Sequence, residues 1–395
     1  MTITPDQLLL DIYTAYLEAR RHKRRTHNQL RFEVNVEEEV MKLFAAIAAR
    51  TYAPRRSVAF MVYQPVQREV FCADFADRVV HHLIFDYINP IFEQVFVPTS
   101  FSCRKGRGTL YGVRTMQQQL ERCTEGYTQE AYILKLDVRG YFMSINRQLL
   151  YEELERTLAR FRYLPTADGT AETWNDRLDY DLVMFLLRQV VFSDPVEGCF
   201  IKGDRKEWEG FPPSKTLFCQ PKGVGLPIGN LTSQLFSNIY LNRFDHWVVS
   251  ELGCPYYGRY VDDFYIIHRD AAYLKGLIPK IRAYLKRELK LTLHPNKVYF
   301  QNSRRGCQFL GAFVKGKQLL AGKRLSSNFK AAAHACATND KLDEQQVVAR
   351  MNSYLGLLRH YSTRKLRKRV VEKFNRRGRY VHCNSYMKIR RRGIN

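Results

Sequence analysis

The stretch from Pro255 to Asp270, PYYGRYVDDFYIIHRD, most narrows what this chain can fold into. Two short runs rich in aromatic and β-branched residues meet at a pair of aspartates, Asp262 and Asp263. This pattern is typical of a β-hairpin with acidic residues at or near its turn. Taken alone, an Asp-Asp dipeptide more often serves only the turn itself, so the rest of the sequence must decide between a structural and a chemical role.

A third aspartate follows another predicted strand. The run AYILKLDVRGYF is rich in β-forming residues up to Asp137. Neighbouring strands could bring Asp137, Asp262 and Asp263 together at one edge of a sheet, where three carboxylates repel one another unless divalent cations neutralise them. Phosphoryl transfer uses such a cluster to hold two Mg²⁺ ions about 3.5 to 4 Å apart. The three acids therefore predict a two-metal site.

The charge of the whole chain points to a polyanionic partner. Its 395 residues carry a formal net charge of +24, with a pI of about 9.7. Such an excess favours nucleic acid held through many Lys and Arg contacts, although any single charge run can be only a solvated face. The nine cysteines include no Cys-x-x-Cys pair, which argues against a disulfide framework and a zinc knuckle. No stretch has the character of a signal peptide or a membrane span, so we expect a cytoplasmic protein without a membrane partner.

The order of predicted elements indicates a mixed α+β chain. Two helices, over residues 4–25 with Thr4 as cap and from Asn35 to about Arg50, form an N-terminal helical extension, residues 1–55. Short strands and longer helices alternate through residues 56–320, with a Gly- and Pro-rich irregular segment before GLPIGN. From about Ser327 the chain is predicted to be helical, polar and increasingly basic, which makes residues 321–395 a third part.

Tyr-Val-Asp-Asp at Tyr260 to Asp263 resembles the metal-binding box of reverse transcriptases, and further boxes of that family occur in order along residues 57–320. They lie around Arg68 and Lys297, and at Ser100–Gly108, Lys135–Asn146, GLPIGNLTSQLFSNIYLN and FLGAFV. The resemblance implies a right-hand polymerase, with fingers, a palm of antiparallel sheet with helices, and a helical thumb.

The same resemblance implies roles for individual residues. Asp137 and Asp262 would ligate both Mg²⁺ ions, with Asp263 as a further ligand or electrostatic support. Phe142 would exclude a ribose 2′-hydroxyl by steric clash, Arg68 would contact the phosphates of the nucleotide, and Lys297 would aid the triphosphate or primer. Phe142 has a plainer alternative as a core aromatic residue, and Arg68 has one as an ordinary surface arginine. The cations expected to hold nucleic acid are Arg104, Lys105, Arg107, Arg376, Arg377 and Arg379.

The fourth box, GLPIGNLTSQLFSNIYLN, indicates which group of reverse transcriptases the chain resembles. Ile228 and Gly229, followed by Ser233 and Gln234, form an Ile-Gly-x-x-x-Ser-Gln pattern. This pattern is similar to reverse transcriptases of diversity-generating retroelements, which copy a template-repeat RNA into cDNA with errors opposite adenines, so that a target gene is diversified. The resemblance places Ile228, Gly229 and Gln234 at the dNTP and implies a small basic partner, the accessory variability determinant. Because Ile228 cannot hydrogen-bond a nucleotide as a Gln would, we hypothesise that it lowers fidelity.

Two other readings stay open. One is a retron-type or group II intron-type reverse transcriptase, which the Ser-Gln ending of the fourth box disfavours. The other is a non-catalytic RNA-binding protein, although a pure binder has no use for clustered acids that repel the phosphates of its ligand.

Overall fold

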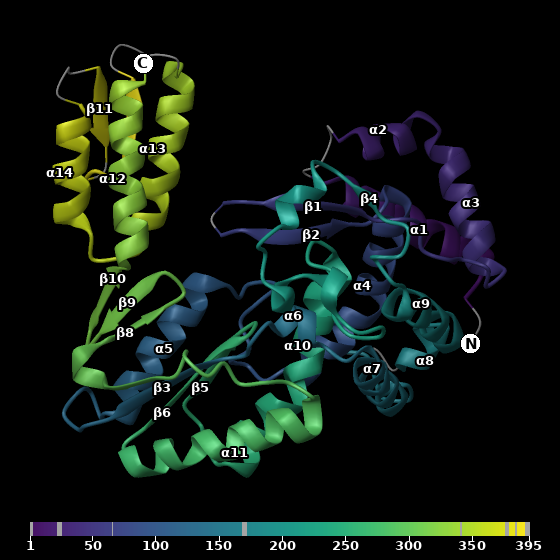
Figure 1. Ribbon diagram of the computed structural model, residues 1–395, viewed down its shortest axis with the longest axis horizontal. Helices are drawn as coiled ribbons and strands as arrows, with labels where there is room; N and C mark the ends of the chain where they lie inside the picture. The colour runs from purple at the N-terminus through teal and green to yellow at the C-terminus, as the bar shows by residue number, and fades with distance from the viewer. Residues whose placement is uncertain are drawn as a thin grey trace. The chain divides into compact units, whose positions relative to one another are not determined.

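A computed structural model describes residues 3–21, 26–64, 66–167, 172–339, 342–375, 379–383 and 385–391, and it contains both helices and sheets, as the sequence predicts. The chain divides into two compact units, whose helices and strands Figure 1 labels. The first comprises residues 1–103, 137–251 and 279–295, and the second comprises residues 104–136, 252–278 and 296–395. The predicted three-part division at residues 55 and 320 stays a prediction. Among the described residues, no helix combines the length and apolar character that crossing a membrane requires.

The first unit is mainly helical. Its elements are α1 (Pro5–Arg20), α2 (His27–Val34), α3 (Val36–Ala48), β1 (Val58–Val62), β2 (Arg68–Cys72), α4 (Phe75–Val95), α6 (Tyr141–Ser144), α7 (Arg147–Phe161), α8 (Trp174–Arg177), α9 (Tyr180–Phe192), β4 (Phe200–Ile201), the 3-10 turns η1 (Arg205–Trp208), η2 (Pro213–Lys215) and η3 (Leu217–Cys219), α10 (Leu231–His246) and the π-helical turn η4 (Trp247–Glu251).

The N-terminal helices begin largely where the sequence predicts. The Thr4 hydroxyl accepts a hydrogen bond from the Gln7 amide at 3.3 Å, and Pro5 occupies the first turn, where its missing N–H costs nothing. Asn35 precedes α3 as predicted, but its side chain makes no capping bond. The short helix α2 between them was not predicted. In the first unit α1 packs on α4, where the Tyr87 hydroxyl donates to Asp11 at 2.7 Å.

The second unit is built around a four-stranded sheet of order β5-β6-β3-β7. Its elements are α5 (Thr109–Cys123), β3 (Tyr132–Asp137), β5 (Tyr257–Tyr260), β6 (Asp263–His268), β7 (Tyr299–Asn302), the 3-10 turn η5 (Ser303–Arg305), β8 (Cys307–Phe309), β9 (Ala312–Lys315), β10 (Gln318–Ala321), α12 (Lys323–Thr338), α13 (Glu344–Leu358), α14 (Arg364–Phe374), β11 (Tyr380–Cys383) and β12 (Lys388–Arg391). Helix α11 (Ala271–Leu289) and the last residue of β3 are shared with the first unit.

Helix α5 is fastened to the four-stranded sheet by one buried side chain. Gln119 donates to the Tyr257 carbonyl at 3.1 Å and accepts from the Tyr265 hydroxyl at 2.8 Å. A buried amide that satisfies both of its ends fixes the helix over the β5–β6 hairpin, since leaving either end without a partner would cost about 1 to 3 kcal/mol.

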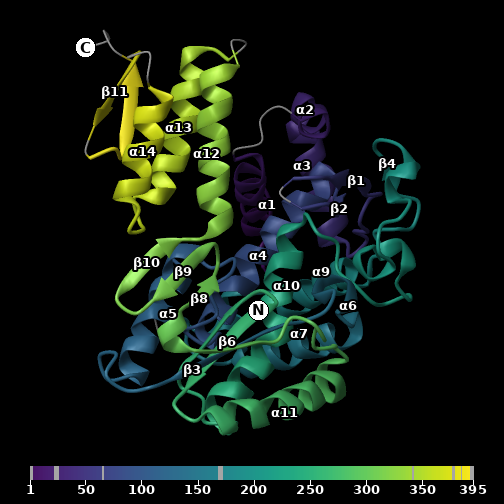
Figure 2. The ribbon, with the colours of Figure 1, turned by 60° about the vertical axis from the view of Figure 1, so that its left-hand side comes forward.

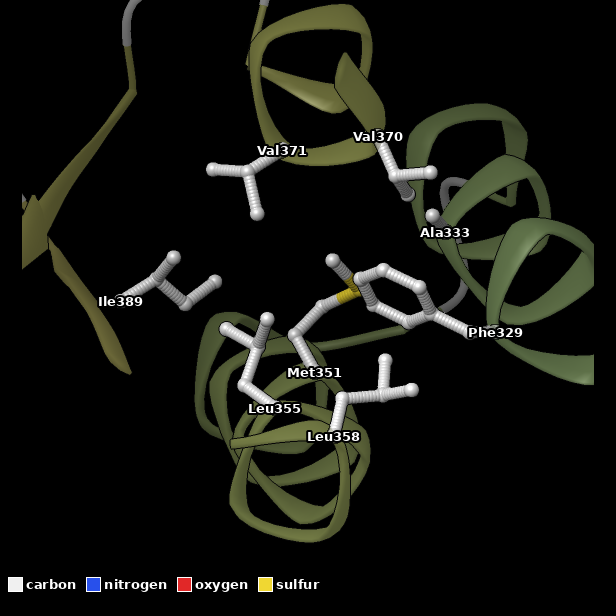
Figure 3. Close-up of a cluster of buried hydrophobic side chains, with 8 residues drawn as sticks. All are labelled: Phe329, Ala333, Met351, Leu355, Leu358, Val370, Val371 and Ile389. Carbon is white, nitrogen blue, oxygen red and sulfur yellow. The ribbon is translucent and has the colours of Figure 1, made fainter. Parts of the chain in front are cut away.

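The C-terminal part of the second unit has its own apolar core (Figure 3), made by Phe329, Ala333, Met351, Leu355, Leu358, Val370, Val371 and Ile389. These side chains come from α12, α13, α14 and β12, which Figures 1 and 2 show together. The expectation of an entirely helical C-terminal part is wrong, because β11 and β12 pair as an antiparallel hairpin. The hairpin forms because Ile389, fully buried, packs into the core between the helices.

Candidate nucleotidyl-transfer site

The β5–β6 hairpin carries Asp262 and Asp263 as predicted. Tyr260 pairs with Asp263, so Val261 and Asp262 form a two-residue turn. Val261 has a φ of 57°, a left-handed conformation that is unusual for a β-branched residue and costs about 1 to 3 kcal/mol. The structure around the turn must therefore hold Val261 in this conformation.

A buried arginine holds this strained turn. Arg259 is fully buried, and its Nη1 donates to the Val261 carbonyl at 3.0 Å. Burying a guanidinium is costly unless its N–H groups and charge find partners. Sequence reasoning missed Arg259, because an arginine in a strand of alternating residues reads as solvent-facing.

A lysine from the neighbouring strand reaches the same hairpin. The Nζ of Lys135 in β3 lies 3.4 Å from Asp263 Oδ2 and donates to the Gln308 carbonyl at 2.9 Å. Burial raises the pKa of the adjacent Cys307 thiol to about 12, with Lys135 lowering it and Asp263 raising it by smaller amounts. Burial therefore favours the neutral thiol of Cys307.

The three predicted metal ligands are divided between the compact units. Asp137 ends β3 and belongs to the first unit, whereas Asp262 and Asp263 belong to the second. All three side chains are half-buried. Within the part of the chain that the structure describes, no group of three or more His, Cys, Asp or Glu side chains is gathered as a metal site. The convergence of the three aspartates thus stays a prediction.

The first unit brings several predicted nucleotide-binding residues together. The Phe71 amide in β2 donates to the Ile228 carbonyl at 2.9 Å, and the Leu226 amide donates to the Phe142 carbonyl at 2.8 Å. Gly229 has a φ of 127°, and a Cβ there would lie 2.8 Å from the Phe71 carbonyl oxygen, so only glycine fits. The segment with Ile228 and Gly229 is therefore held between β2 and the segment that carries Phe142.

The side chains in this region differ in exposure. Phe142 and Ile228 are half-buried, while Arg68 at the start of β2 is exposed. Ile228 packs against an apolar cluster formed by Ala59, Phe71, Met143 and Leu217. Gln234 lies exposed on α10.

Sequence reasoning also missed Glu69, the neighbour of Arg68. Its carboxylate is buried and accepts hydrogen bonds from Trp208 Nε1 at 2.6 Å, from the Leu217 amide at 2.7 Å and from the Thr216 hydroxyl. These donors come from the irregular segment before GLPIGN, so Glu69 fastens that segment to β2. The hydrogen-bond partners of Glu69 lie almost 150 positions away in the sequence, so no pattern near Glu69 predicts them.

The predicted nucleic-acid-binding cations lie in different surroundings. Lys105 and Arg379 are exposed, and Arg107 is half-buried; Lys297, predicted to contact the nucleotide, is exposed as well. Arg104 is buried, with 7% of its surface exposed, so its surroundings differ from the open loop that the sequence suggested. Arg376 and Arg377 lie outside the described residues.

Comparisons with known proteins give only distant likenesses. No family model matches this chain. Protein YkfC of Escherichia coli (strain K12) is 22% identical over 268 residues, which cover 60% of this chain and 60% of YkfC. The chain therefore spans less than two thirds of the length of that relative.

Solved telomerase structures are also similar to this chain. Apo telomerase from Candida tropicalis has a TM-score of 0.48 with 11% identity, over 82% of this chain and 59% of the telomerase. Telomerase from Candida albicans in complex with a TWJ fragment of telomeric RNA has a TM-score of 0.47 with 11% identity, over 82% of this chain and 58% of the telomerase. Likenesses of this size are too distant to assign a function.

Proposed function

We propose that this chain is an RNA-directed DNA polymerase of right-hand architecture, which copies template RNA into cDNA from dNTPs. The observation that carries the proposal is the contact between Lys135 and Asp263 at 3.4 Å. Lys135 and Asp137 are two positions apart in β3, so their side chains point to the same face of the strand. The contact supports a metal site in which Asp137 joins Asp262 and Asp263.

The donor set suits Mg²⁺. Carboxylate oxygens are the hard ligands that this cation prefers. Two Mg²⁺ ions held by Asp137, Asp262 and Asp263 would stabilise the attacking 3′ oxygen and the departing pyrophosphate. Lys135, beside Asp263, would limit the repulsion among the carboxylates.

The first unit would supply the nucleotide pocket. Phe142, Ile228 and Gly229 belong to segments bonded to one another through Leu226 and Phe71. The exposed Arg68 lies at the end of β2, the strand bonded to Ile228. A guanidinium fork there would bind phosphate oxygens, and the ring of Phe142 would exclude a 2′-hydroxyl.

The Ile-Gly-x-x-x-Ser-Gln pattern extends the proposal to the diversity-generating subtype. The enzyme would copy a template-repeat RNA into cDNA with errors opposite adenines, assisted by a small basic accessory protein in the cytoplasm. The packing of Ile228 against apolar side chains supports its proposed role, because it places no hydrogen-bonding group at this position.

Primer extension tests the polymerase proposal. Wild-type protein, supplied with an RNA template, a DNA primer, dNTPs and Mg²⁺, should extend the primer, and Asp262→Ala should abolish extension. Glu197→Ala, which removes an exposed carboxylate elsewhere, serves as the matched control and should extend normally. Extension by Asp262→Ala at the wild-type rate would refute the proposal. Sequencing the product would show whether errors gather opposite template adenines.

A further inference from the structure

An aromatic pair lies on the sheet of the second unit, away from the residues discussed so far. The rings of Tyr132 in β3 and Phe300 in β7 stack with centroids 5.6 Å apart and planes 8° from parallel. Phe300 in β7 pairs with Leu134 in β3, so these two side chains lie on the same face of the sheet. Tyr132 is two positions before Leu134 and therefore lies on that face as well. Side chains alternate along β3, so the pair lies on the face opposite Lys135.

The two rings open into a basic groove. Tyr132, Phe300, Gln301, Asn302, Arg304 and Arg305 line an open groove of about 450 Å³. Both rings are half-buried and both arginines are exposed. The ammonium of Lys275 lies 5.1 Å from the centre of the Phe300 ring. Rings that serve only as core would be covered by apolar neighbours rather than reached through a groove with cations.

A second groove continues the first, because Arg304 lines both. It is formed by Thr124, Tyr127, Gln129, Ser303, Arg304, Lys315, Gly316, Lys317, Gln318 and Leu320. Lys315 and Lys317 are exposed. Two acids lie nearby. Glu130 lies 3.5 Å from Arg304 and accepts from the Tyr132 hydroxyl at 3.3 Å, and Glu121 acts electrostatically on Tyr127. The lining of the two grooves itself includes the cations Arg304, Arg305, Lys315 and Lys317 and neither of these acids.

We infer that these two grooves form a binding site for a single-stranded segment of nucleic acid. An unpaired base would stack on the Tyr132–Phe300 pair, and the following phosphates would pass Arg304 and Arg305 toward Lys315 and Lys317. Aromatic platforms flanked by cations bind single strands because every base has a π-face and every nucleotide a negative charge. A duplex cannot use the rings, since its bases are already paired and stacked.

The inference does not depend on polymerase activity. Tyr132 and Phe300 point away from the face of Lys135, so the site would hold a strand outside the proposed site of synthesis. A polymerase with such a site could retain a single-stranded part of its RNA while another part is copied.

Site-resolved photo-cross-linking tests the inference on the full chain. The probes are short single-stranded RNA and DNA oligonucleotides that carry thiouridine or thiothymidine, and mass spectrometry locates the cross-linked residues. We expect cross-links at Tyr132 or Phe300. A preference for the RNA or the DNA probe would identify which strand the site takes.

Variants make the test quantitative. Tyr132→Leu and Phe300→Leu keep apolar side chains on the strands, and each should raise the probe concentration for half-maximal cross-linking at the remaining ring by about fivefold or more. Arg305→Ala should lower the slope of log affinity against log salt by about 0.7. Tyr163→Leu is the matched control, because Tyr163 is an exposed aromatic residue beside an arginine in the first unit.

The outcomes separate this inference from the proposed function. Cross-links at Tyr132 or Phe300 would support the site whether or not the protein extends primers. The inference would be overturned if folded Tyr132→Leu and Phe300→Leu cross-link as well as wild type. It would also be overturned if neither ring cross-links, or if an acidic peptide binds the grooves and the oligonucleotides do not.

Discussion

At the scale of single residues, Arg259 and Val261 show how the hairpin turn is kept in an unfavourable shape. The left-handed Val261 exposes its carbonyl to Arg259, whose guanidinium is fully buried in the strand. The turn carries Asp262, so we expect Arg259 to set the direction of that carboxylate, as a positioning residue in the proposed reaction.

Arg259→Ala should therefore lower kcat in primer extension by about tenfold or more, since misplacing a reacting group by about 1 Å costs that much or more. KM for dNTP should change little, and the Mg²⁺ concentration needed for half-maximal rate should rise. Arg259→Lys, which restores a donor and a charge, should recover part of kcat. Arg269→Ala is the control, because Arg269 bonds to Glu125 and Cys123 at the surface. A folded Arg259→Ala with wild-type kcat and Mg²⁺ dependence would refute this role.

Ile228 is the residue that we hypothesise to lower the fidelity of copying. Ile228→Gln should reduce misincorporation opposite template adenine, because the amide could hydrogen-bond the incoming nucleotide, a contact worth on the order of 1 kcal/mol. Since Ile228 packs against Phe71 and its apolar neighbours, the variant should also unfold at a slightly lower temperature. Ile228→Leu, which adds no polar group, controls for altered packing. An error rate in Ile228→Gln equal to that of wild type would sink the hypothesis.

At the scale of elements, α4 carries a buried histidine that ties stability to pH. Burial lowers the pKa of His81 to about 3, and its Nδ1 has no hydrogen-bond partner among the described residues. His81 therefore stays neutral in the fold, whereas an unfolded chain protonates it below its ordinary value of 6.5. The stability that the fold has with a neutral His81 is fully present above pH 6.5. As the pH falls toward 3, the unfolded chain takes up a proton that the fold excludes, so the free energy of unfolding falls by up to about 5 kcal/mol.

His81→Leu should flatten the fall of unfolding free energy on acidification, as measured by denaturant titrations at several pH values. Asp77, one turn earlier in α4, acts in the opposite direction. Burial raises the pKa of Asp77 to about 6. The contribution of Asp77 to stability is therefore present below its ordinary pKa of 3.8, and it is lost as the pH rises through 6. His334→Leu, at an exposed position in α12, is the control. An acid profile of His81→Leu identical to that of wild type would contradict this account.

The β11–β12 hairpin is bonded to α13 by the amide side chain of Asn352 and by an ion pair at 2.9 Å between Arg391 and Glu344. Asn352 donates to the Ile389 carbonyl at 2.9 Å and accepts from the Ile389 amide at 2.8 Å. Asn352→Ala removes both bonds, each worth about 1 kcal/mol, so the amides of β12 should exchange with deuterium faster. Ser353→Ala, on the exposed side of the same helix, should leave the exchange unchanged. Unaltered exchange of β12 in Asn352→Ala would show that the apolar core and the Arg391–Glu344 ion pair hold the hairpin without Asn352.

The elements that can be predicted correctly from the sequence are those whose patterns lie within a few neighbouring residues. Thr4 caps α1, and the two apolar runs around Asp262 and Asp263 form a hairpin, because capping and alternation act within a few residues. The hairpin of β11 and β12 was missed because its short basic strands are held by Asn352 and the core around Ile389. Contacts of this kind exist only in the folded chain.

The candidate site follows the same rule. Asp262 and Asp263 could be placed in a turn from their neighbours, but nothing local marks the strain of Val261 or the burial of Arg259. Arg104 reads as an exposed cation in a Gly-rich loop, yet it is buried. Residue types thus indicate the chemistry, while surroundings built from distant residues decide which side chains can take part.

At the scale of the whole molecule, the residues that the proposed reaction would use come from distant parts of the sequence. The segments with Phe142 and Ile228 belong to the first unit, and the hairpin with Asp262 belongs to the second. The net charge of +24 would suit the proposed nucleic-acid partner. The central claim is that Asp137 joins the hairpin aspartates in one metal site.

Cleavage by bound iron measures that convergence most directly. Fe²⁺ in place of Mg²⁺, with ascorbate and peroxide, produces hydroxyl radicals that cut the backbone beside the metal. We predict cuts near both Asp137 and Asp262, suppressed by excess Mg²⁺ and absent from Asp262→Ala. Cuts near one segment alone, or cuts that persist in Asp262→Ala, would contradict a shared metal site.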